Sequence, residues 1–446
     1  MLRDDRIDYP MELAQILTFK GHPDTERLHS ATKFALGRHP LLTARIARLD
    51  GRLYWVQADE PMPPEVVEAS ETPDFPRMEK LNLYHTRGCR LVMKRTADGF
   101  MLLVQVHHAV CDGLGLMQFI SDLFDAYAGK NSASPRLDAN LLTKRGRVRS
   151  DNPLTPRKCL RLLPAAIVWL LWTLCYFMVH AKSLIPTRGN DSKDLSKQDQ
   201  RPSFKEPAII SHRFDRKTTE DLSKIVHTKL NTTLNTLLLC ELHRTMAQWR
   251  LDNIPQARPW QAIRIAVPVS MRGKIHAGMP AANTVSMVFI DRWHFGLNHF
   301  AAYLKSHRLC MQMVDRYRVG AILPLSLSFL RGLAPSGRIL QWTIDVLSPP
   351  TTAVLTNIGR YMGRSHLPRD SGRRLMIGNL LLVEEQCVVP LRSGTQLGIV
   401  IINYANQLSL HLNFDPVHLS PRQASDILAR FTSHITSHLD KFIEAD

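Results

Sequence analysis

The chain has 446 residues, 44% of them hydrophobic and 22% charged, which is the composition of a globular protein long enough for more than one core. Its 57 Lys and Arg residues against 40 Asp and Glu residues give a formal charge of +17. That excess favours anionic partners: an acidic membrane, an acidic carrier protein or the phosphates of coenzyme A. No nucleic-acid-binding motif accompanies the charge, so nucleic acid is not an expected partner.

The first part of the chain, residues 1–130, alternates between helical and strand patterns. Capping residues, apolar spacing and turn residues predict a helix, a strand pair, a strand and a second helix, at residues 24–37, 45–56, 100–106 and 114–127. The strand pair is expected to turn at Asp50-Gly51. The segment between the last two elements is therefore predicted to be a strand-to-helix turn.

The character of the chain changes over residues 131–206. A basic stretch precedes an uncharged apolar run, Leu162 to Val179, and a polar tract without periodicity follows at residues 187–205. We interpret the whole region as a linker between two halves of the chain.

The second half, residues 207–446, again mixes strands with helices. A helix pair is predicted over residues 218–249 with a break near Asn231, and a final amphipathic helix starts after Ser420-Pro421. Strands are predicted at residues 208–214, 263–269, 282–290, 353–356, 375–383, 398–404 and 408–414. Both halves are therefore expected to be α/β units.

The predicted turn of the first half carries the most chemical information. It reads His107-His108-Ala109-Val110-Cys111-Asp112-Gly113, an HHxxxDG pattern. A histidine titrates near neutral pH, so it is suited to take the proton of a nucleophile that attacks a thioester carbonyl. The chain has no GxSxG elbow, and direct transfer without an acyl-enzyme is the expected route.

The pattern resembles the active-site motif of the chloramphenicol-acetyltransferase-like superfamily, which includes acyl-CoA-dependent O-acyltransferases, wax ester synthases and peptide-synthetase condensation domains. The resemblance implies two α/β sandwich subdomains that meet at a central substrate tunnel. It implies that His108 is the general base and that His107 supports it by packing or hydrogen bonding. Gly113 is expected to keep the turn tight and to leave room for the pantetheine arm.

The resemblance also implies a structural role for Asp112. In this superfamily that aspartate pairs with an arginine of the second half, and Val267-Pro268-Val269-Ser270-Met271-Arg272 is similar to the PVxxR stretch of wax ester synthases. Arg272 is the expected partner, because a buried aspartate without one is very costly. Two alternatives stay open: Asp112 orients the histidine as in a Ser-His-Asp triad, or Arg272 is a solvated charge at a strand end.

Weaker similarities to the superfamily lie in three other segments: His39-Pro40-Leu41-Leu42, Thr233-Leu234-Asn235 and Leu355-Thr356-Asn357-Ile358-Gly359-Arg360. Asn357 and Asn283 become candidate substrate contacts, although a turn-forming role suits Asn357 equally well. The DFGWG motif of the plant-type and chloramphenicol branches is absent, so the acceptor is not identified.

The resemblance implies an O-acyltransferase that moves an acyl group from a CoA thioester to the hydroxyl of a lipid-like or amphipathic alcohol. Acyl-CoA is then a co-substrate, with no metal and no permanently bound cofactor, and a monomer is expected. A condensation-type enzyme that uses a carrier-protein thioester is the alternative within the enzyme class. A non-catalytic lipid-binding protein on the same scaffold is the alternative outside it.

The apolar run at residues 162–179 bears on the location of the protein. Trp169, Trp172 and Tyr176 form an aromatic stripe at helical spacing, after a basic stretch that suits an anionic leaflet. We favour a helix in the membrane interface over a helix buried against the protein, and both over a span that would separate His108 from Arg272. Seven cysteines without CxxC spacing and a charged N-terminus predict a cytoplasmic protein, peripheral at the inner face of a membrane.

Overall fold

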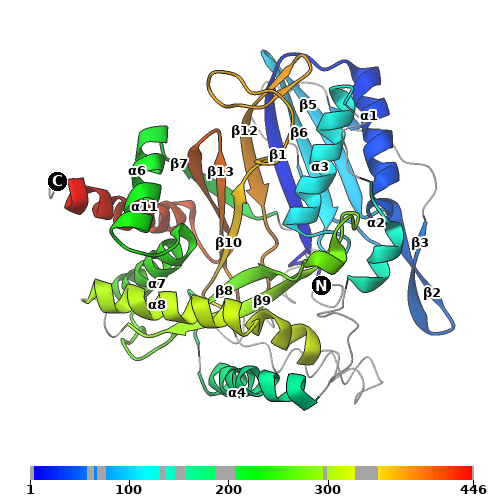
Figure 1. Cartoon of the computed structure of the whole chain (residues 1–446). Coiled ribbons are helices and arrows are strands. Elements are labelled where there is room, and N and C mark those ends of the chain that lie inside the picture. Colours follow the sequence, from blue (N-terminus) through cyan, green and yellow to red (C-terminus); the bar gives the residue numbers. More distant parts are fainter. Residues whose placement is uncertain are drawn as a thin grey trace, which may run out of the picture.

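The computed structural model describes residues 5–57, 65–67, 77–130, 136–145, 156–179, 181–185, 206–294, 299–326 and 350–443. The polar tract predicted at residues 187–205 lies outside this range. Two six-stranded mixed sheets with flanking helices form the body of the protein (Figure 1). The α/β class and the two-unit architecture predicted from the sequence are confirmed.

The first sheet has the strand order β11-β12-β1-β6-β5-β4. Its strands are β1 (Glu12–Lys20), β4 (Glu65–Val67), β5 (Cys89–Thr96), β6 (Gly99–His107), β11 (Met376–Ile377) and β12 (Leu380–Val388). Helices α1 (Thr25–Arg38) and α3 (Gly113–Tyr127) cover one face, where Leu17 and Phe119 belong to the same core (Figure 1). Beside them, α2 (Pro40–Thr43) leads into the hairpin of β2 (Ala44–Leu49) and β3 (Arg52–Gln57), which turns at the predicted Asp50-Gly51.

Two strands of the first sheet come from the second half of the chain. β12 pairs antiparallel with β1, with Leu17 opposite Glu385. The predicted strand at residues 375–383 is divided between β11 and β12, because Gly378 turns the chain with φ of 60°. The two halves, residues 1–130 and 207–446, are separate in the sequence, but in space they share the first sheet.

The second sheet has the strand order β7-β14-β13-β10-β8-β9. Its strands are β7 (Ala208–Arg213), β8 (Ile263–Ser270), β9 (Val285–Arg292), β10 (Ala353–Arg360), β13 (Leu397–Tyr404) and β14 (Gln407–Phe414). Its helices are α6 (Arg216–Thr228), α7 (Leu234–Asn253), α8 (Phe300–Arg316) and α11 (Pro421–Ile443), and they share one core with the sheet (Figure 1). The predicted break between α6 and α7 is confirmed, and Asn231 there has φ of 45°.

Helix α4 (Pro156–Met178) contains the apolar run and packs along the second half. Trp169 Nε1 donates to the Tyr317 carbonyl at 2.8 Å, and Arg264 Nη2 donates to the Tyr176 carbonyl at 2.9 Å. Val168 and Trp172 pack against the second core. Within the part of the chain that the structure describes, no helix is long and apolar enough to cross a membrane.

Candidate active site

The HHxxxDG segment lies where β6 meets α3, as the sequence predicts. β6 ends at His107, whose carbonyl accepts from Val110 N–H at 3.0 Å and so closes a turn. Asp112 then caps α3, because its Oδ1 accepts from Gly115 N–H at 2.8 Å. The His108 N–H donates to the Met11 carbonyl at 2.7 Å, which attaches the turn to the start of β1.

Asp112 is buried and pairs with an arginine from the other half of the chain. Arg272 Nη1 lies 2.8 Å from both carboxylate oxygens, and Thr284 N–H donates to Oδ2 at 2.8 Å. Arg272 also donates from Nη2 to the Ala282 carbonyl at 2.7 Å. This geometry is that of a structural ion pair. Both carboxylate oxygens are bound by Arg272, and they also accept from the backbone N–H groups of Gly115 and Thr284.

The segment over residues 279–284 carries further contacts between the halves. His39 Nδ1 accepts from Ala281 N–H at 2.9 Å, which leaves the ring proton on Nε2 to bond with Asp122 at 3.1 Å. Gln118 donates to the Met279 carbonyl at 3.1 Å. The motif around His39 therefore has a physical role, which is to hold the second half against the first beside the histidine turn.

His108 is half-buried at this junction. Asn283 Nδ2 donates to the His108 carbonyl and lies 3.2 Å from Nδ1, while Asn283 Oδ1 accepts from Val285 N–H and so fixes the orientation of the amide. Burial lowers the pKa of the His108 imidazole below its usual value of 6.5, against the opposing effects of a hydrogen bond to its own carbonyl and of the Asp112 charge. The neutral form of the ring, which is the one able to accept a proton, therefore predominates at neutral pH.

His107 points away from this junction and is completely buried. Its Nδ1 accepts from Ala109 N–H at 3.0 Å, and its Nε2 lies 3.5 Å from Asp5 Oδ2. One oxygen of the buried Glu12 also faces this ring, since the three groups place a ligand atom each within 4.8 Å of one another. His107 is therefore placed as a support of the turn, whereas His108 faces the other half.

Asn357 lies elsewhere in the second half. It is exposed, its Nδ2 donates to Asn235 Oδ1 at 3.3 Å, and its Oδ1 accepts from Gly359 N–H at 2.8 Å. The two weaker motif segments of the second half thus meet each other. Among the described hydrogen bonds none joins Asn357 to the histidine turn, and Asn357 lies within β10, where the pairing with β13 shifts register, rather than in a turn.

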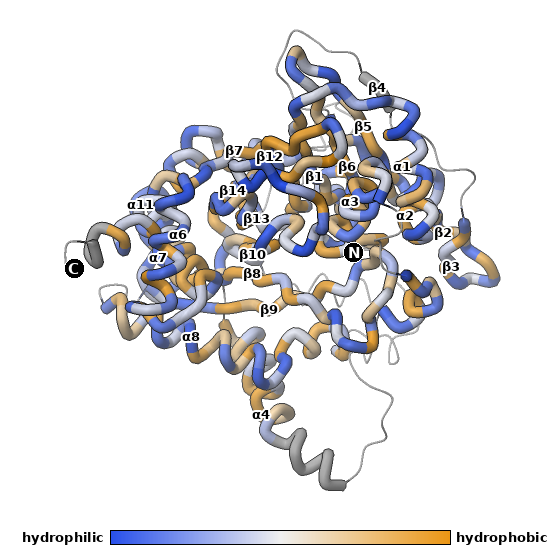
Figure 2. Tube along the Cα trace, turned by 45° about the horizontal axis from the view of Figure 1, so that its top comes forward, coloured by the Kyte–Doolittle hydropathy of each residue, from blue (hydrophilic) through white to orange (hydrophobic). Residues whose placement is uncertain are grey.

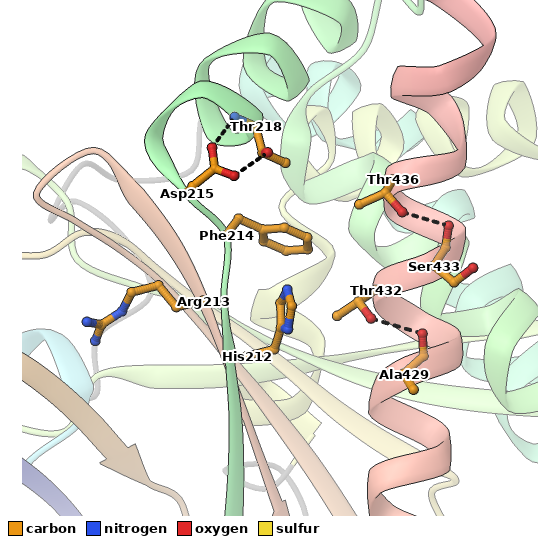
Figure 3. Close-up of a pocket in the computed structure, with 9 residues that line it drawn as sticks. All are labelled: His212, Arg213, Phe214, Asp215, Thr218, Ala429, Thr432, Ser433 and Thr436. Carbon is orange, nitrogen blue, oxygen red and sulfur yellow. Dashed lines mark hydrogen bonds between the residues drawn. The ribbon is translucent and has the colours of Figure 1, made fainter.

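A groove of about 390 Å³ lies far from these residues in the sequence, between the end of β7 and α11 (Figure 3). Its lining includes His212 and two threonines of α11, Thr432 and Thr436, whose hydroxyls already donate to carbonyls of their own helix. None of the residues of the histidine turn lines it.

Sequence reasoning did not find Gly115. A Cβ atom at this position would lie 2.8 Å from Cys111 Sγ and 3.1 Å from the Ala282 backbone, so only glycine lets α3 approach the other half this closely. At Gly113, by contrast, a Cβ would meet nothing within 4 Å, which leaves open space at the start of the helix. The only signal for Gly115 in the sequence is a second glycine in the first turn of a helix.

The paired sheets, with an HHxxxDG turn at their junction, form a fold that condensation domains also have. Three of the solved structures with this fold illustrate the likeness. The first condensation domain of the calcium-dependent antibiotic synthetase, with bound substrate analogue, matches with a TM-score of 0.68 at 15% identity, over 97% of this chain and 92% of its own. Polyketide synthase associated protein 5 from Mycobacterium tuberculosis matches with a TM-score of 0.62 at 14% identity, over 96% and 95%.

The third structure is the epimerization domain from the third module of tyrocidine synthetase B, with a TM-score of 0.62 at 16% identity, over 98% of this chain and 93% of its own. No protein-family model matches the sequence. Two uncharacterized proteins from two strains of Mycobacterium tuberculosis are each 30% identical to this chain over 141 residues. The match covers 29% of this chain and 32% of each relative, so it spans less than a third of their length.

Proposed function

We propose that the protein is an O-acyltransferase that moves an acyl group from acyl-CoA to the hydroxyl of a lipid-like alcohol, with His108 as general base. The observation that carries the proposal is the position of His108: half-buried on a closed turn, neutral at neutral pH, and held by Asn283 at the junction of the two halves. A base in that place can reach substrates that enter between the halves.

The base acts through Nε2. A proton on Nδ1 leaves the Nε2 lone pair for the acceptor hydroxyl, and Asn283 Nδ2 then donates to the His108 carbonyl alone, whereas a proton on Nε2 would let Nδ1 accept from Asn283. Base catalysis requires the first tautomer. His108 Nε2 takes the hydroxyl proton while the oxygen attacks the thioester carbonyl carbon. The carbon–sulfur bond then breaks, and the departing thiolate takes the proton from the imidazolium.

The donor is an acyl thioester on an anionic carrier, which suits a chain of charge +17. We propose free acyl-CoA, because the open space at Gly113 would admit a pantetheine arm beside His108. The alternative donor is a carrier-protein thioester, as in a condensation-type enzyme, and an assay of thiol release tells it apart from acyl-CoA. A non-catalytic lipid-binding protein is distinguished by the absence of any turnover.

Thiol release from long-chain acyl-CoA, with and without a fatty alcohol, tests the proposal. We expect alcohol-dependent release that His108→Ala reduces at least about a hundredfold, with the exposed His29→Ala as the matched control. Release from an acylated carrier protein but not from acyl-CoA would establish the condensation-type donor instead. Equal release by wild type and His108→Ala would refute the assignment of the base.

We also propose that the enzyme works at a membrane surface, which suits an amphipathic acceptor. The face of α4 that is turned away from the second core carries an apolar stripe, and α4 extends from the rest of the molecule in Figure 2. The stripe residues are 48–61% exposed and recur at helical spacing: Ile167, Leu170, Leu171, Leu174 and Phe177. A helix tied to the protein on one face, with an apolar opposite face, is suited to lie in the plane of a bilayer interface.

Two exposed tryptophans lie near the C-terminal end of this stripe. Trp293 follows Arg292, which pairs with Ile263, and Trp260 lies three residues before Ile263 in the sequence. The backbone just after α4 reaches the same place, because Lys182 N–H donates to the Ala262 carbonyl at 3.5 Å. Tryptophan prefers the headgroup level of a bilayer, and the exposed Lys182 there suits anionic lipid.

A second copy of the chain is a poorer occupant of the α4 stripe than a membrane, because two copies of charge +17 repel each other. We expect the full-length protein to float with phosphatidylglycerol-containing vesicles and to float less with pure phosphatidylcholine. Replacing Leu170, Leu171 and Leu174 by Gln should weaken the partition roughly a hundredfold, at about 1 kcal/mol for each leucine.

The matched control is the pair Leu49→Gln and Leu53→Gln on the β2–β3 hairpin, where the leucines are 55% and 48% exposed. Unchanged flotation of the α4 variant, or equal loss in the hairpin variant, would refute the membrane surface. A dimer in solution that the α4 substitutions dissociate would replace the membrane by a second copy. Activity with a short-chain soluble alcohol is expected to survive the α4 substitutions.

A further inference from the structure

A buried group of ionisable side chains lies directly behind the catalytic turn, on the side away from the junction. It consists of Asp5 from the N-terminal segment, Glu12 at the start of β1, and His107 at the end of β6, and we call it the N-terminal triad. Glu12 and His107 are 1% and 0% exposed, and they face each other as a register pair of the first sheet. Lys80 Nζ lies 3.0 Å from Asp5 Oδ1 and completes the set of charged groups around it.

A hydrogen bond from its backbone neighbour favours one tautomer of His107. Because Nδ1 accepts from Ala109 N–H at 3.0 Å, the proton of the neutral ring is on Nε2. That proton points to the carboxyl groups, with Asp5 Oδ2 at 3.5 Å. His107 thus links the backbone of the turn, through its own ring, to the acids behind it.

The same acids also hold the chain segment on which His108 rests. Asp5 Oδ1 accepts from Met11 N–H at 3.2 Å, and the Met11 carbonyl accepts the N–H of His108 at 2.7 Å. Glu12 Oε1 accepts from Leu81 N–H at 2.8 Å, which leaves Oε2 buried without a hydrogen-bond partner. An orphaned buried carboxylate oxygen is costly, whereas a protonated Oε2 can donate to the neighbouring Asp5 carboxylate.

We propose that Asp5 and Glu12 are positioning residues for the general base: a proton held between them keeps His107 in its Nε2–H form and thereby fixes the turn that carries His108. Electrostatics supports this arrangement, since the Lys80 ammonium lies 3.0 Å from Asp5 Oδ1 and balances its charge, which leaves the proton to Glu12. Burial raises the pKa of Glu12 to about 7, with the Asp5 charge acting in the same direction.

Burial also acts to raise the pKa of Asp5, but the His107 ring at 3.5 Å and the hydrogen bonds from Lys80 and the Met11 N–H outweigh it and lower the pKa. The pKa values of the two acids therefore shift in opposite directions, so that Asp5 is charged while Glu12 holds a proton. The triad suits a shared proton better than a metal ion. A metal would have to bind Nε2, which holds the ring proton, and it would lie close to the Lys80 ammonium.

The kinetic test rests on the proposed function. We expect Asp5→Asn to lower kcat by about tenfold to a hundredfold with little change in KM, since the base is misplaced and binding is not. Asp8→Asn, in the same N-terminal segment, is the matched control. Wild-type kcat should decline above about pH 7 as Glu12 ionises, and Glu12→Gln should remove that decline. Glu385→Gln, another acid that is 1% exposed, should retain the decline.

A second measurement does not depend on activity. NMR of the ¹⁵N-histidine-labelled protein should show His107 as the Nε2–H tautomer in wild type and Glu12→Gln, and as a mixture in Asp5→Asn. If the tautomers are as expected but no acyl transfer is detected, the proposed role of the triad stands and only the proposed function is refuted. An Nδ1–H tautomer in wild type, or equal kcat in Asp5→Asn and Asp8→Asn, would overturn the proposal. Stoichiometric Zn²⁺ binding that Glu12→Gln abolishes would also overturn it.

Discussion

Replacing Arg272 by Ala should destabilise the protein by about 3–5 kcal/mol, because it leaves a buried carboxylate without its counter-charge. The side chain of Asp112 is 5% exposed and that of Arg272 is 21% exposed, so water cannot easily substitute for the guanidinium. Three donors to the carboxylate remain in the variant: Gly115 N–H at 2.8 Å, Thr284 N–H at 2.8 Å and the Thr284 hydroxyl at 3.3 Å. They place the expected loss near the lower end of that range.

Urea unfolding at pH 7, followed by circular dichroism, measures this loss. The matched control is Arg430→Ala, which removes a partly exposed arginine from its pairs with Asp252 and Asp426 and should cost less than about 1 kcal/mol. The double variant Asp112→Asn with Arg272→Ala should lose less than the sum of the two single variants, since neither charge is then left alone. A loss for Arg272→Ala no larger than that for Arg430→Ala would refute the reasoning and make Arg272 a solvated charge.

Two further predictions concern buried positions. Gly115→Ala should cost about 1–3 kcal/mol in the same unfolding assay, because its Cβ would lie 2.8 Å from Cys111 Sγ. Gly113→Ala, whose Cβ would meet nothing within 4 Å, should be close to wild type in stability. Equal losses of stability in the two variants would contradict the close approach at Gly115. Burial raises the pKa of Glu385 from 4.5 to about 8, so the folded state keeps a proton that the unfolded state releases. The contribution of this group to the free energy of unfolding is therefore complete below pH 4.5 and declines as the pH rises to about 8. Glu385→Gln should flatten that decline when the melting temperature is measured from pH 4 to 9, and an unchanged slope would contradict it.

Local patterns in the sequence were sufficient to predict most elements, because caps and apolar spacing act within a few residues. The strands β1, β4 and β5 and the helix α8 escaped prediction. β1 has Leu17 in the core under the helices and Ile16 in a second core on the other face, so both faces are apolar and the two-residue alternation is lost. The contribution of β12 to the first sheet also escaped, since pairing between strands so distant in sequence has no local signal.

The same distinction applies to the site. The motif identified the histidine turn, and the resemblance to a superfamily supplied a second-half arginine, which lies where a partner of Asp112 must lie. Gly115 and the acids behind His107 could not be found in this way. Their importance depends on which backbone and which ring lie opposite them, and these neighbours are set by the assembled fold.

The contacts that hold the two halves together and the contacts that orient His108, the proposed base, use the same short segment. Within residues 279–284, the Ala281 N–H donates to His39 Nδ1, the Ala282 carbonyl accepts from the Asp112 N–H at 3.5 Å, and Asn283 holds the His108 carbonyl. A change in the relative position of the halves must therefore move the base as well. Because Asp112 is attached to the same segment through Thr284, loss of the Arg272 pair should lower kcat even in molecules that remain folded. An Arg272→Ala protein with reduced stability but wild-type kcat would show that the base is oriented by its own turn alone.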